Sequence, residues 1–518
     1  MSNELLPASI FPRGRQLTVF AMLVSCFALW GLLNNMTDNL VPAFQRIFTM
    51  DPSRAGLVQV AFYGAYAVLA LFASIIAEEF SYRVGVLAGL TIYVIGSLLY
   101  IPACVYASFD IYFVAIFAVA AGCSLLETTC NPYVLSLGDE VTAVRRLNFA
   151  QAFNPVGSIL GIFLAQKLIL ANLNPATASE RAQMAPDALA AIVHNELFWV
   201  CVPYVGLCAL AVVVWVFFLR INPFISTFAQ KRVGFGRVAM AGLFALAPLT
   251  ALYCLFPQMD KVLWIICGMA GPFTYVLLVK DYRSMLGILL RRPRYWCGVI
   301  AQFFYVGVQI AVWTWLNAYC QQEFGVKPDE AAFYYLVSIF LFVAMRWVAT
   351  ALMRCVNPAL LLAAFALVAI IATAGVMYLP STPIFTVLGH PIGWNAVALV
   401  CVTGCMSLMF PTIYGMALGG LDPRAFRLGA AGLIMSILGG AIITPWMGAI
   451  AGSESSAWFA LVPGFDAVRN LDLQVSCQSI RASFVVPVVC FVIVFAYALL
   501  FSRKVELDRD NQESGAEE

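Results

Sequence analysis

The sequence predicts an all-α polytopic membrane protein, and three observations support this class. Of its 518 residues, 62% are hydrophobic and only 11% are charged, which is far less charge than soluble chains carry. Apolar runs of about 20 residues recur along the whole chain, and a helix of that length crosses a hydrocarbon core of roughly 30 Å. Lysine and arginine gather in alternate connections between these runs, as they do in membrane proteins of fixed orientation.

Fourteen apolar spans are expected, in two sets of six with an extra pair between them. The first set lies near residues 17–42, 55–78, 84–103, 109–137, 147–170 and 197–219. The second set lies near 296–319, 331–353, 358–378, 394–418, 428–451 and 482–502. The extra pair, near 237–256 and 262–280, is interpreted as an inserted two-helix hairpin. The expected domains are an N-terminal six-helix bundle at 1–221, a connecting region with the two extra segments at 222–295, a C-terminal six-helix bundle at 296–505 and a disordered cytoplasmic tail at 506–518.

Two short internal echoes indicate that the two sets of six spans are homologous. The stretch GCSLLETTCNPY from Gly122 resembles GCMSLMFPTIYG from Gly404, and GSILGIF from Gly157 resembles MSILGGA from Met435. Both pairs are offset by about 280 residues, consistent with two halves related by an axis along the membrane normal. The spans match in order only if the extra pair lies outside the repeat.

The distribution of basic residues predicts the orientation. With the N-terminus in the cytoplasm, 20 lysine and arginine residues fall in cytoplasmic segments and 7 in outer segments. Both termini are therefore expected in the cytoplasm, in a multi-pass protein of the plasma (inner) membrane. The first 16 residues contain Arg13 and Arg15 and lack a short apolar core with a cleavage site, so no removable signal peptide is expected.

Two carboxylates lie well within apolar spans, Asp38 in GLLNNMTDNLVP and Glu127 in GCSLLETTCNPY. A charge at the bilayer centre costs on the order of 2.5–3.5 kcal/mol on insertion scales, so such residues usually face a cavity and act on ions or substrate. Both are candidate proton carriers, and the alternative is an acid hydrogen-bonded between helices for packing alone. Arg346, midway along its span, is interpreted as a structural cation paired with backbone carbonyls, and the alternative is a substrate-binding or coupling group.

Amide, acidic and aromatic side chains form a stripe along each of four spans. At 100° per residue each set shares one helix face, within about 140° of arc at most. The sets are Trp30, Asn34, Asn35 and Asp38; Glu127 and Asn131; Asn148, Gln151 and Asn154; and Gln302, Tyr305, Gln309 and Trp313. Amides donate and accept hydrogen bonds, which suits sugar hydroxyls, and an aromatic face stacks on a pyranose. The stripes predict a polar central cavity, with the alternative that single amides join helices to one another.

Four longer motifs carry a resemblance to a known family: NNxxD in the first span, LETxxNP in the fourth, LNxAQxFN in the fifth and AQFxYVGxQ in the seventh. They resemble the L-fucose:proton symporter family of the major facilitator superfamily, over nearly the whole chain except about 222–290. The resemblance implies the major facilitator fold, a central sugar site between two six-helix bundles and proton coupling through two acids. It assigns Asp38 and Glu127 to the proton. The substrate-binding candidates are Trp30, Asn35, Gln151, Asn154, Gln302, Gln309 and Trp313 from the resemblance, and Tyr305 from its place on the same stripe.

The expected function is therefore a proton-coupled monosaccharide importer that works by alternating access, with L-fucose as the first candidate. A sodium-coupled or uniport carrier of glucose, galactose or an amino sugar stays open, because two acids favour coupling without distinguishing H⁺ from Na⁺. An enzyme is not expected, since HExxH, a GxGD-type pair and a nucleophile elbow are all absent. The expected partners are a sugar, a proton and the lipid bilayer, with no nucleic acid, no cofactor, no metal and a monomeric state.

Overall fold

The computed structural model describes residues 10–38, 40–50, 57–176, 180–181, 183–220, 235–255, 261–451 and 480–514. These residues form helices and one two-stranded sheet, so the predicted all-helical class is confirmed. Twelve of the described helices are long and apolar enough to cross a membrane. Backbone contacts divide the chain into two units. The N-unit comprises Ala8–Arg292 with Gly420–Met435, and the C-unit comprises Pro293–Gly419 and the chain from Ser436 onward.

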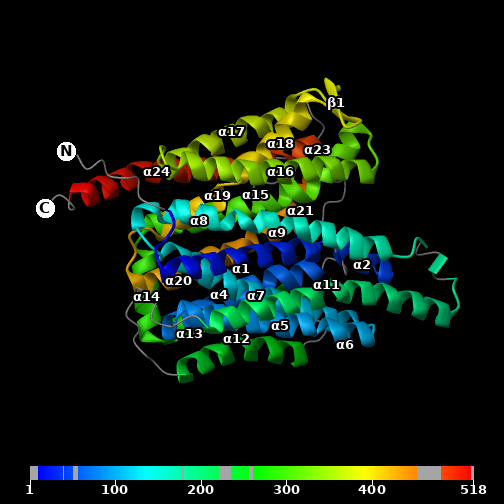
Figure 1. Cartoon of the computed structure of the whole chain (residues 1–518), viewed down its shortest axis with the longest axis horizontal. Coiled ribbons are helices and arrows are strands. Elements are labelled where there is room, and N and C mark those ends of the chain that lie inside the picture. The colour runs from blue at the N-terminus through cyan, green and yellow to red at the C-terminus, as the bar shows by residue number, and fades with distance from the viewer. Residues whose placement is uncertain are drawn as a thin grey trace. The chain divides into compact units, whose positions relative to one another are not determined.

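The N-unit consists of long helices that pack side by side, joined by short helical turns (Figure 1). Its helices are α1 (Arg15–Asp38), α2 (Leu40–Ile47), α4 (Leu57–Glu79), α5 (Tyr82–Leu98), α6 (Tyr100–Val105), α7 (Phe109–Leu135), α8 (Ala143–Gln151), α9 (Phe153–Leu164), α11 (Pro186–Arg220), α12 (Phe235–Leu255), α13 (Lys261–Leu278), α14 (Lys280–Leu290) and α20 (Pro423–Met435). Its short helical turns are η1 (Glu140–Thr142), η2 (Ala165–Ile169) and η3 (Leu170–Asn172).

The C-unit holds the remaining elements. They are α15 (Pro293–Phe324), α16 (Pro328–Leu352), α17 (Pro358–Tyr378), β1 (Phe385–Val387), β2 (His390–Ile392), α18 (Trp394–Met406), α19 (Met409–Leu418), η5 (Ser436–Leu438), α21 (Gly439–Ala451), α23 (Ile480–Ser483) and α24 (Val485–Ser514). The antiparallel strands are joined by Leu388 and Gly389, which both have positive φ. A two-residue turn of this kind matches the twist of the flanking strands.

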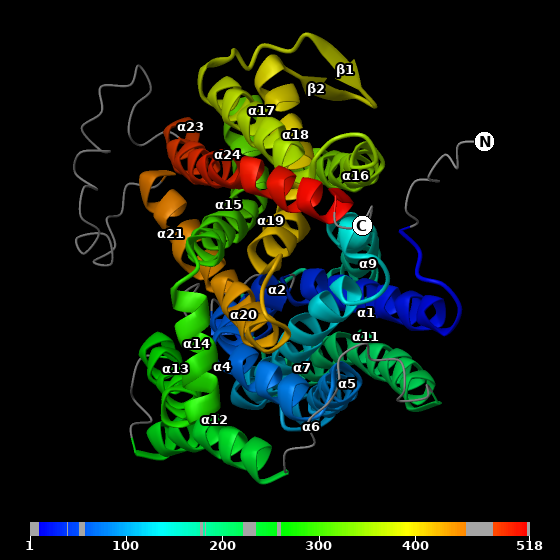
Figure 2. The same cartoon turned by 90° about the vertical axis from the view of Figure 1, so that its left-hand side faces the viewer.

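The extra pair of helices docks on α4 inside the N-unit. Helices α12 and α13 pack on each other and on α4, with α14 beside α13 (Figure 2). Glu79, at the end of α4 and 5% exposed, accepts hydrogen bonds from the Tyr282 hydroxyl at 2.6 Å and from Arg237 Nη1 at 3.3 Å. Burial and the Glu79 carboxylate raise the pKa of Tyr282 above its usual range, so its hydroxyl stays a neutral donor. A buried carboxylate that accepts both hydrogen bonds at its Oε1 thus fixes the pair to the bundle.

These two helices cover Phe235–Leu255 and Lys261–Leu278, and their side chains are described only in part. Their described apolar stretches are Phe235–Ala245 and Gly268–Leu278, against expected spans near 237–256 and 262–280. Twelve of the fourteen expected spans are found among the described residues, and the extra pair stays a prediction.

One helix lies in an unexpected unit. The boundary at Arg292 is close to the expected one at 295, but α20 packs on α4, α7 and α14 and so belongs to the N-unit. Arg427 of α20 donates to Glu78 of α4 at 2.5 Å and stacks on the Tyr82 ring at 5.3 Å. The 3₁₀ turn η5 then leads the chain back into the C-unit. Hydropathy predicts one continuous span at 428–451. It carries no information about packing partners, so it cannot show that the first half of this span packs in the N-unit.

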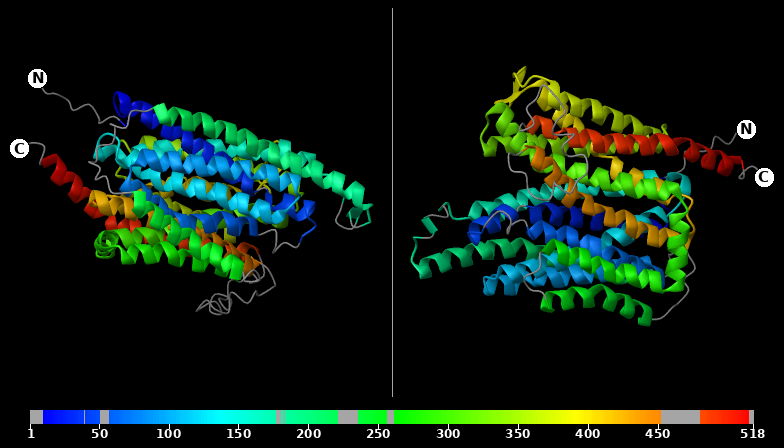
Figure 3. Two further views of the ribbon diagram at one scale, coloured as in Figure 1. Left: turned by 90° about the horizontal axis from the view of Figure 1, so that it is seen from below. Right: turned by 180° about the vertical axis from the view of Figure 1, so that it is seen from behind.

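In the expected disordered tail at 506–518, the structure describes the residues up to Ser514. Helix α24 continues through them and runs past the other helices of its unit (Figure 3). The sequence KVELDRDNQ contains neither glycine nor proline, and its lysine, glutamate, leucine and arginine are good helix formers. Residues 515–518 lie outside the described part of the chain.

Proline breaks the expected span at 394–418 into α18 and α19. Pro411 lacks an N–H and cannot bond the carbonyl four residues earlier, which is that of Ser407. Arg346 of α16, 4% exposed, donates its Nε–H to this carbonyl at 2.5 Å. Arg346 therefore has the structural role expected for it, since it satisfies a backbone oxygen that the helix leaves free.

Candidate functional site

Glu127 lies in the middle of α7, in the core of the N-unit. The side chain is 1% exposed, and its Oε2 has no hydrogen-bond partner in the part of the chain that the structure describes. The hydroxyl of the next residue, Thr128, is also buried without a described hydrogen-bond partner. Buried polar atoms are nearly always paired, so an unpaired carboxylate oxygen here is available for a proton or a ligand.

An amide pair lies one helical turn from this acid. Gln151 at the end of α8 donates its Nε2 to Asn131 Oδ1 of α7 at 2.7 Å, and the two residues are 4% and 0% exposed. The Nδ2 of Asn131 finds no acceptor among the described residues. Because Asn131 follows Glu127 by four residues, both present on one face of α7. The structure thus brings together Glu127 and Asn131 on one face of α7 and Gln151 from α8.

The stripe on α1 is described as far as Thr37. Trp30 is 7% exposed and lies beside Phe27, with ring centroids 5.6 Å apart. Asn35 approaches the Gly31 carbonyl of its own helix at 3.5 Å. Asn34 keeps a buried Oδ1 for which no described donor is in reach. Asp38 is the last residue of α1, and its side chain lies outside the described residues.

Asn154 joins two helices. Its Nδ2 lies 3.4 Å from the Phe27 carbonyl of α1. Helices α1 and α9 approach so closely that a Cβ on Gly31 would overlap the backbone of Asn154. This arrangement matches the alternative in which a single amide joins helices.

In the C-unit, Gln302 on α15 is fully buried, and neither end of its amide has a described partner. The amide offers a donor and an acceptor from one point. Gln309, two turns further along α15, is half-buried. Trp313, one turn beyond Gln309, has a buried indole N–H without a described acceptor. The Trp313 ring meets Phe342 edge-on, with centroids 5.2 Å apart.

Tyr305 shares the stripe with Gln302 but has another use. Its hydroxyl donates to the Met406 carbonyl at 2.9 Å, and the side chain is fully buried. Met406 is the last residue of α18, where the proline-induced break begins. Tyr305 therefore supports the α18–α19 break and has no free polar atom directed along its stripe.

Three asparagines without an assigned role also have a buried polar atom that lacks a described partner. Asn34 and Asn131 are recognised as stripe members from their spacing, whereas Asn317 is missed. Its Oδ1 is buried without a donor among the residues described. It lies 15 residues after Gln302, or about 60° away around the helix, so continuing the stripe by one turn would find it.

No group of three or more metal-ligating side chains occurs in the part of the chain that was described. Buried amides and an acid with unused polar atoms, held inside membrane-crossing helices, are typical of proteins that move a polar solute across the bilayer.

Comparisons with known proteins define the family. The family model described as the Major Facilitator Superfamily matches residues 18–444. The L-fucose-proton symporter of Haemophilus influenzae is 33% identical over 483 residues, which cover 92% of this chain and 95% of that protein. A glucose/galactose transporter of Brucella abortus is 27% identical over 481 residues, with 92% of each chain covered. The crystal structure of a major facilitator superfamily transporter, FucP, in the outward conformation aligns with a TM-score of 0.71 at 27% identity, covering 94% of this chain and 99% of that one.

The chain therefore belongs to the Major Facilitator Superfamily and, within it, to the family of the L-fucose–proton symporters. It is a multi-pass membrane protein and a transporter rather than an enzyme.

Proposed function

We propose that this chain imports L-fucose together with a proton by alternating access. The identity to an L-fucose-proton symporter over nearly the full length of both proteins supports the substrate. The observation that carries the proposal is Glu127, a fully buried acid whose Oε2 has no described partner, one turn from an amide pair. An acid in this position can hold a proton and release it when the sugar leaves.

In this proposal Asp38 and Glu127 carry the proton. The sugar is bound by Trp30, Asn35, Gln151, Gln302, Gln309 and Trp313, which offer amides and aromatic faces. Asn154 and Tyr305 direct their polar atoms to backbone carbonyls, so we assign them to the shape of the cavity wall. No resident cofactor takes part, and the only other solute is the co-transported proton.

Uptake of radiolabelled L-fucose into proteoliposomes tests this function. With an acidic exterior and a neutral interior, the purified protein is expected to accumulate L-fucose above the external concentration. A protonophore should abolish accumulation and leave equilibration intact. Accumulation that depends on a sodium gradient and ignores the pH gradient would contradict proton coupling.

Gln302 provides a test of the sugar site. Gln302→Leu removes two polar atoms at nearly constant volume, and neutral hydrogen bonds contribute about 0.5–1.5 kcal/mol each. The Kd for L-fucose, measured by calorimetry or counterflow, is therefore expected to rise about tenfold. Gln322→Leu, an exposed residue near the end of the same helix, is the matched control. An unchanged Kd in Gln302→Leu would remove this residue from the site.

A second substrate class has one observation in its favour. The glucose/galactose transporter of Brucella abortus is 27% identical over a similar length, so glucose, galactose or an amino sugar, carried with sodium or as a uniport, is the alternative. Counterflow with each sugar against L-fucose separates the two, because only a bound sugar exchanges with label trapped inside.

We also propose that both termini face the cytoplasm of the cell, that α12 and α13 cross the plasma (inner) membrane as a hairpin, and that the protein works as a monomer. The basic residues near 280–294 support this orientation. A cysteine introduced at Leu388, 86% exposed in the β1–β2 turn, should react with an impermeant maleimide added to intact cells.

A further inference from the structure

A groove runs along the outside of the C-unit, away from the polar stripe of α15. Helices α16 and α17 both pack on α18, and the space between them encloses about 480 Å³. Its walls come from α16, α17, α18 and the two strands. Val337, Val368 and Val397 are 37%, 45% and 40% exposed, so the groove opens onto the surface of the unit.

The lining is apolar along its whole length. On α16 it includes Phe333, Val337, Leu341 and Met345, a stripe with a spacing of four residues, and the ring of Tyr334. Gly404 of α18 contributes no side chain, which deepens the floor. The hydroxyl of Tyr334, the main polar atom nearby, donates to the Pro391 carbonyl at 2.5 Å, so only its ring faces the groove. Such walls offer nothing to a sugar, an ion or a charged peptide.

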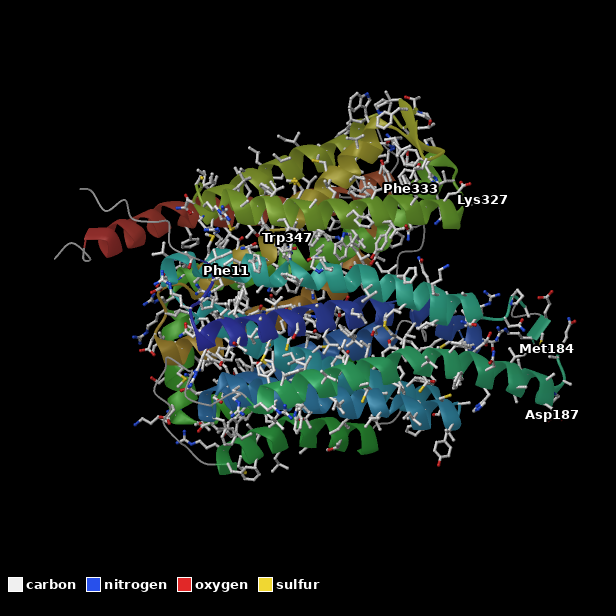
Figure 4. All side chains as sticks on the ribbon, in the orientation of Figure 1. Phe11, Met184, Asp187, Lys327, Phe333 and Trp347 are labelled. Carbon is white, nitrogen blue, oxygen red and sulfur yellow. The ribbon has the colours of Figure 1, made fainter. Side chains whose placement is uncertain are left out.

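The dimensions match one leaflet of a bilayer. From Phe333 to Met345 the helix rises about 18 Å, slightly more than half of a hydrocarbon core of roughly 30 Å. At one end of the groove, Phe333 and Lys327 lie at the same end of α16, beside β1 (Figure 4). His390 stacks on Phe333 with centroids 4.2 Å apart, and Trp394 is 54% exposed. Exposed aromatic and basic residues of this kind mark the membrane–water interface.

We propose that this groove binds one acyl chain of a bilayer phospholipid, with the chain entering from the β1–β2 end and lying along α16 over Gly404. An empty groove of this size would leave its lining without packing partners, and in a membrane the available partner is hydrocarbon. The site is separate from transport chemistry, because no residue of the polar stripes lines it.

Photocrosslinking tests the proposal. The full-length protein is reconstituted with a phosphatidylethanolamine that carries a diazirine in its acyl chain, illuminated and analysed by peptide mass spectrometry. Crosslinks are expected to concentrate on peptides that contain Val337–Met345 and Val397–Gly404. Helix α24 is the comparison, because its Val492 is 47% exposed. If the unmodified protein crosslinks evenly over these peptides and over α24, the proposal is overturned.

A pair of variants sharpens the result. Val400→Phe fills the groove, and the crosslink yield on its peptides should fall about tenfold, the factor expected when roughly two buried methylene groups lose their contacts. Val492→Phe makes the same change on an exposed face of α24 that does not line the groove and should leave the yield unchanged. Equal yields in the two variants would overturn the proposal.

Discussion

Glu127→Gln is expected to abolish proton-driven accumulation of L-fucose while the protein still exchanges the sugar across the membrane. Glutamine has nearly the same shape and keeps the neighbouring contacts, but it cannot take up and release a proton. With one proton per sugar, a gradient of one pH unit supports at most about tenfold accumulation. The inside-to-outside ratio in proteoliposomes should therefore fall from a value approaching ten to about one.

The control for this change is Glu140→Gln, which removes a carboxylate from an exposed position in η1. It should accumulate sugar as the unmodified protein does. Counterflow without a gradient separates loss of coupling from loss of folding, because a misfolded variant fails both assays. Persistent gradient-driven accumulation in Glu127→Gln would exclude Glu127 as the coupling acid.

Spacing along a helix predicts which side chains share a face, and this accounts for most of the candidate site. Glu127 and Asn131 are one turn apart in any α-helix, so their common face follows from numbering alone. The bond from Gln151 to Asn131 does not, because it depends on how α7 and α8 pack. Tyr305 illustrates the limit of the argument, since its hydroxyl is drawn to a carbonyl of α18 that is 101 residues away in sequence.

Helix breaks were harder to predict than helix existence. Hydropathy averages over about 20 residues and reports one span at 394–418, whereas Pro411 ends the regular bonding inside it. The same occurs at 147–170, where Pro155 stands in the first turn of α9 just after α8 ends. A proline in the first turn of a helix loses no helical bond. In both breaks the proline lies in the first turn of the second helix, where it is tolerated.

The two adjacent glutamates Glu78 and Glu79 show what composition misses. In the sequence they are two neighbouring acidic residues at the end of a span. In the structure Glu78 binds Arg427 of α20, and Glu79 binds Tyr282 and Arg237 of the inserted segment. These partners are separated from them by 158 to 349 residues, so no local pattern identifies them.

Glu196→Gln is expected to produce the largest loss of stability among these changes. Glu196 of α11 pairs with Arg181 at 2.6 Å, and the two side chains are 1% and 0% exposed. The carboxylate also accepts the Asn174 backbone N–H at 2.8 Å. Removing one partner of a buried ion pair leaves an uncompensated charge and costs about 3–5 kcal/mol. Because about 1 kcal/mol shifts Tm by roughly 2–4 °C in large domains, the melting temperature in detergent should fall by on the order of 10 °C.

The double variant Arg181→Met/Glu196→Leu distinguishes a lost interaction from a stranded charge. Replacing both members of a buried pair by apolar groups is often neutral, so the double variant should recover most of the lost Tm at the same scan rate. Glu140→Gln, at an exposed site, should melt with the unmodified protein. A single Glu196→Gln variant that melts within about one degree of the unmodified protein would mean that Arg181 finds other acceptors. The carbonyls of Asn174 and Ala176, both 3.3 Å from its guanidinium, are then sufficient to hold the connection between α9 and α11.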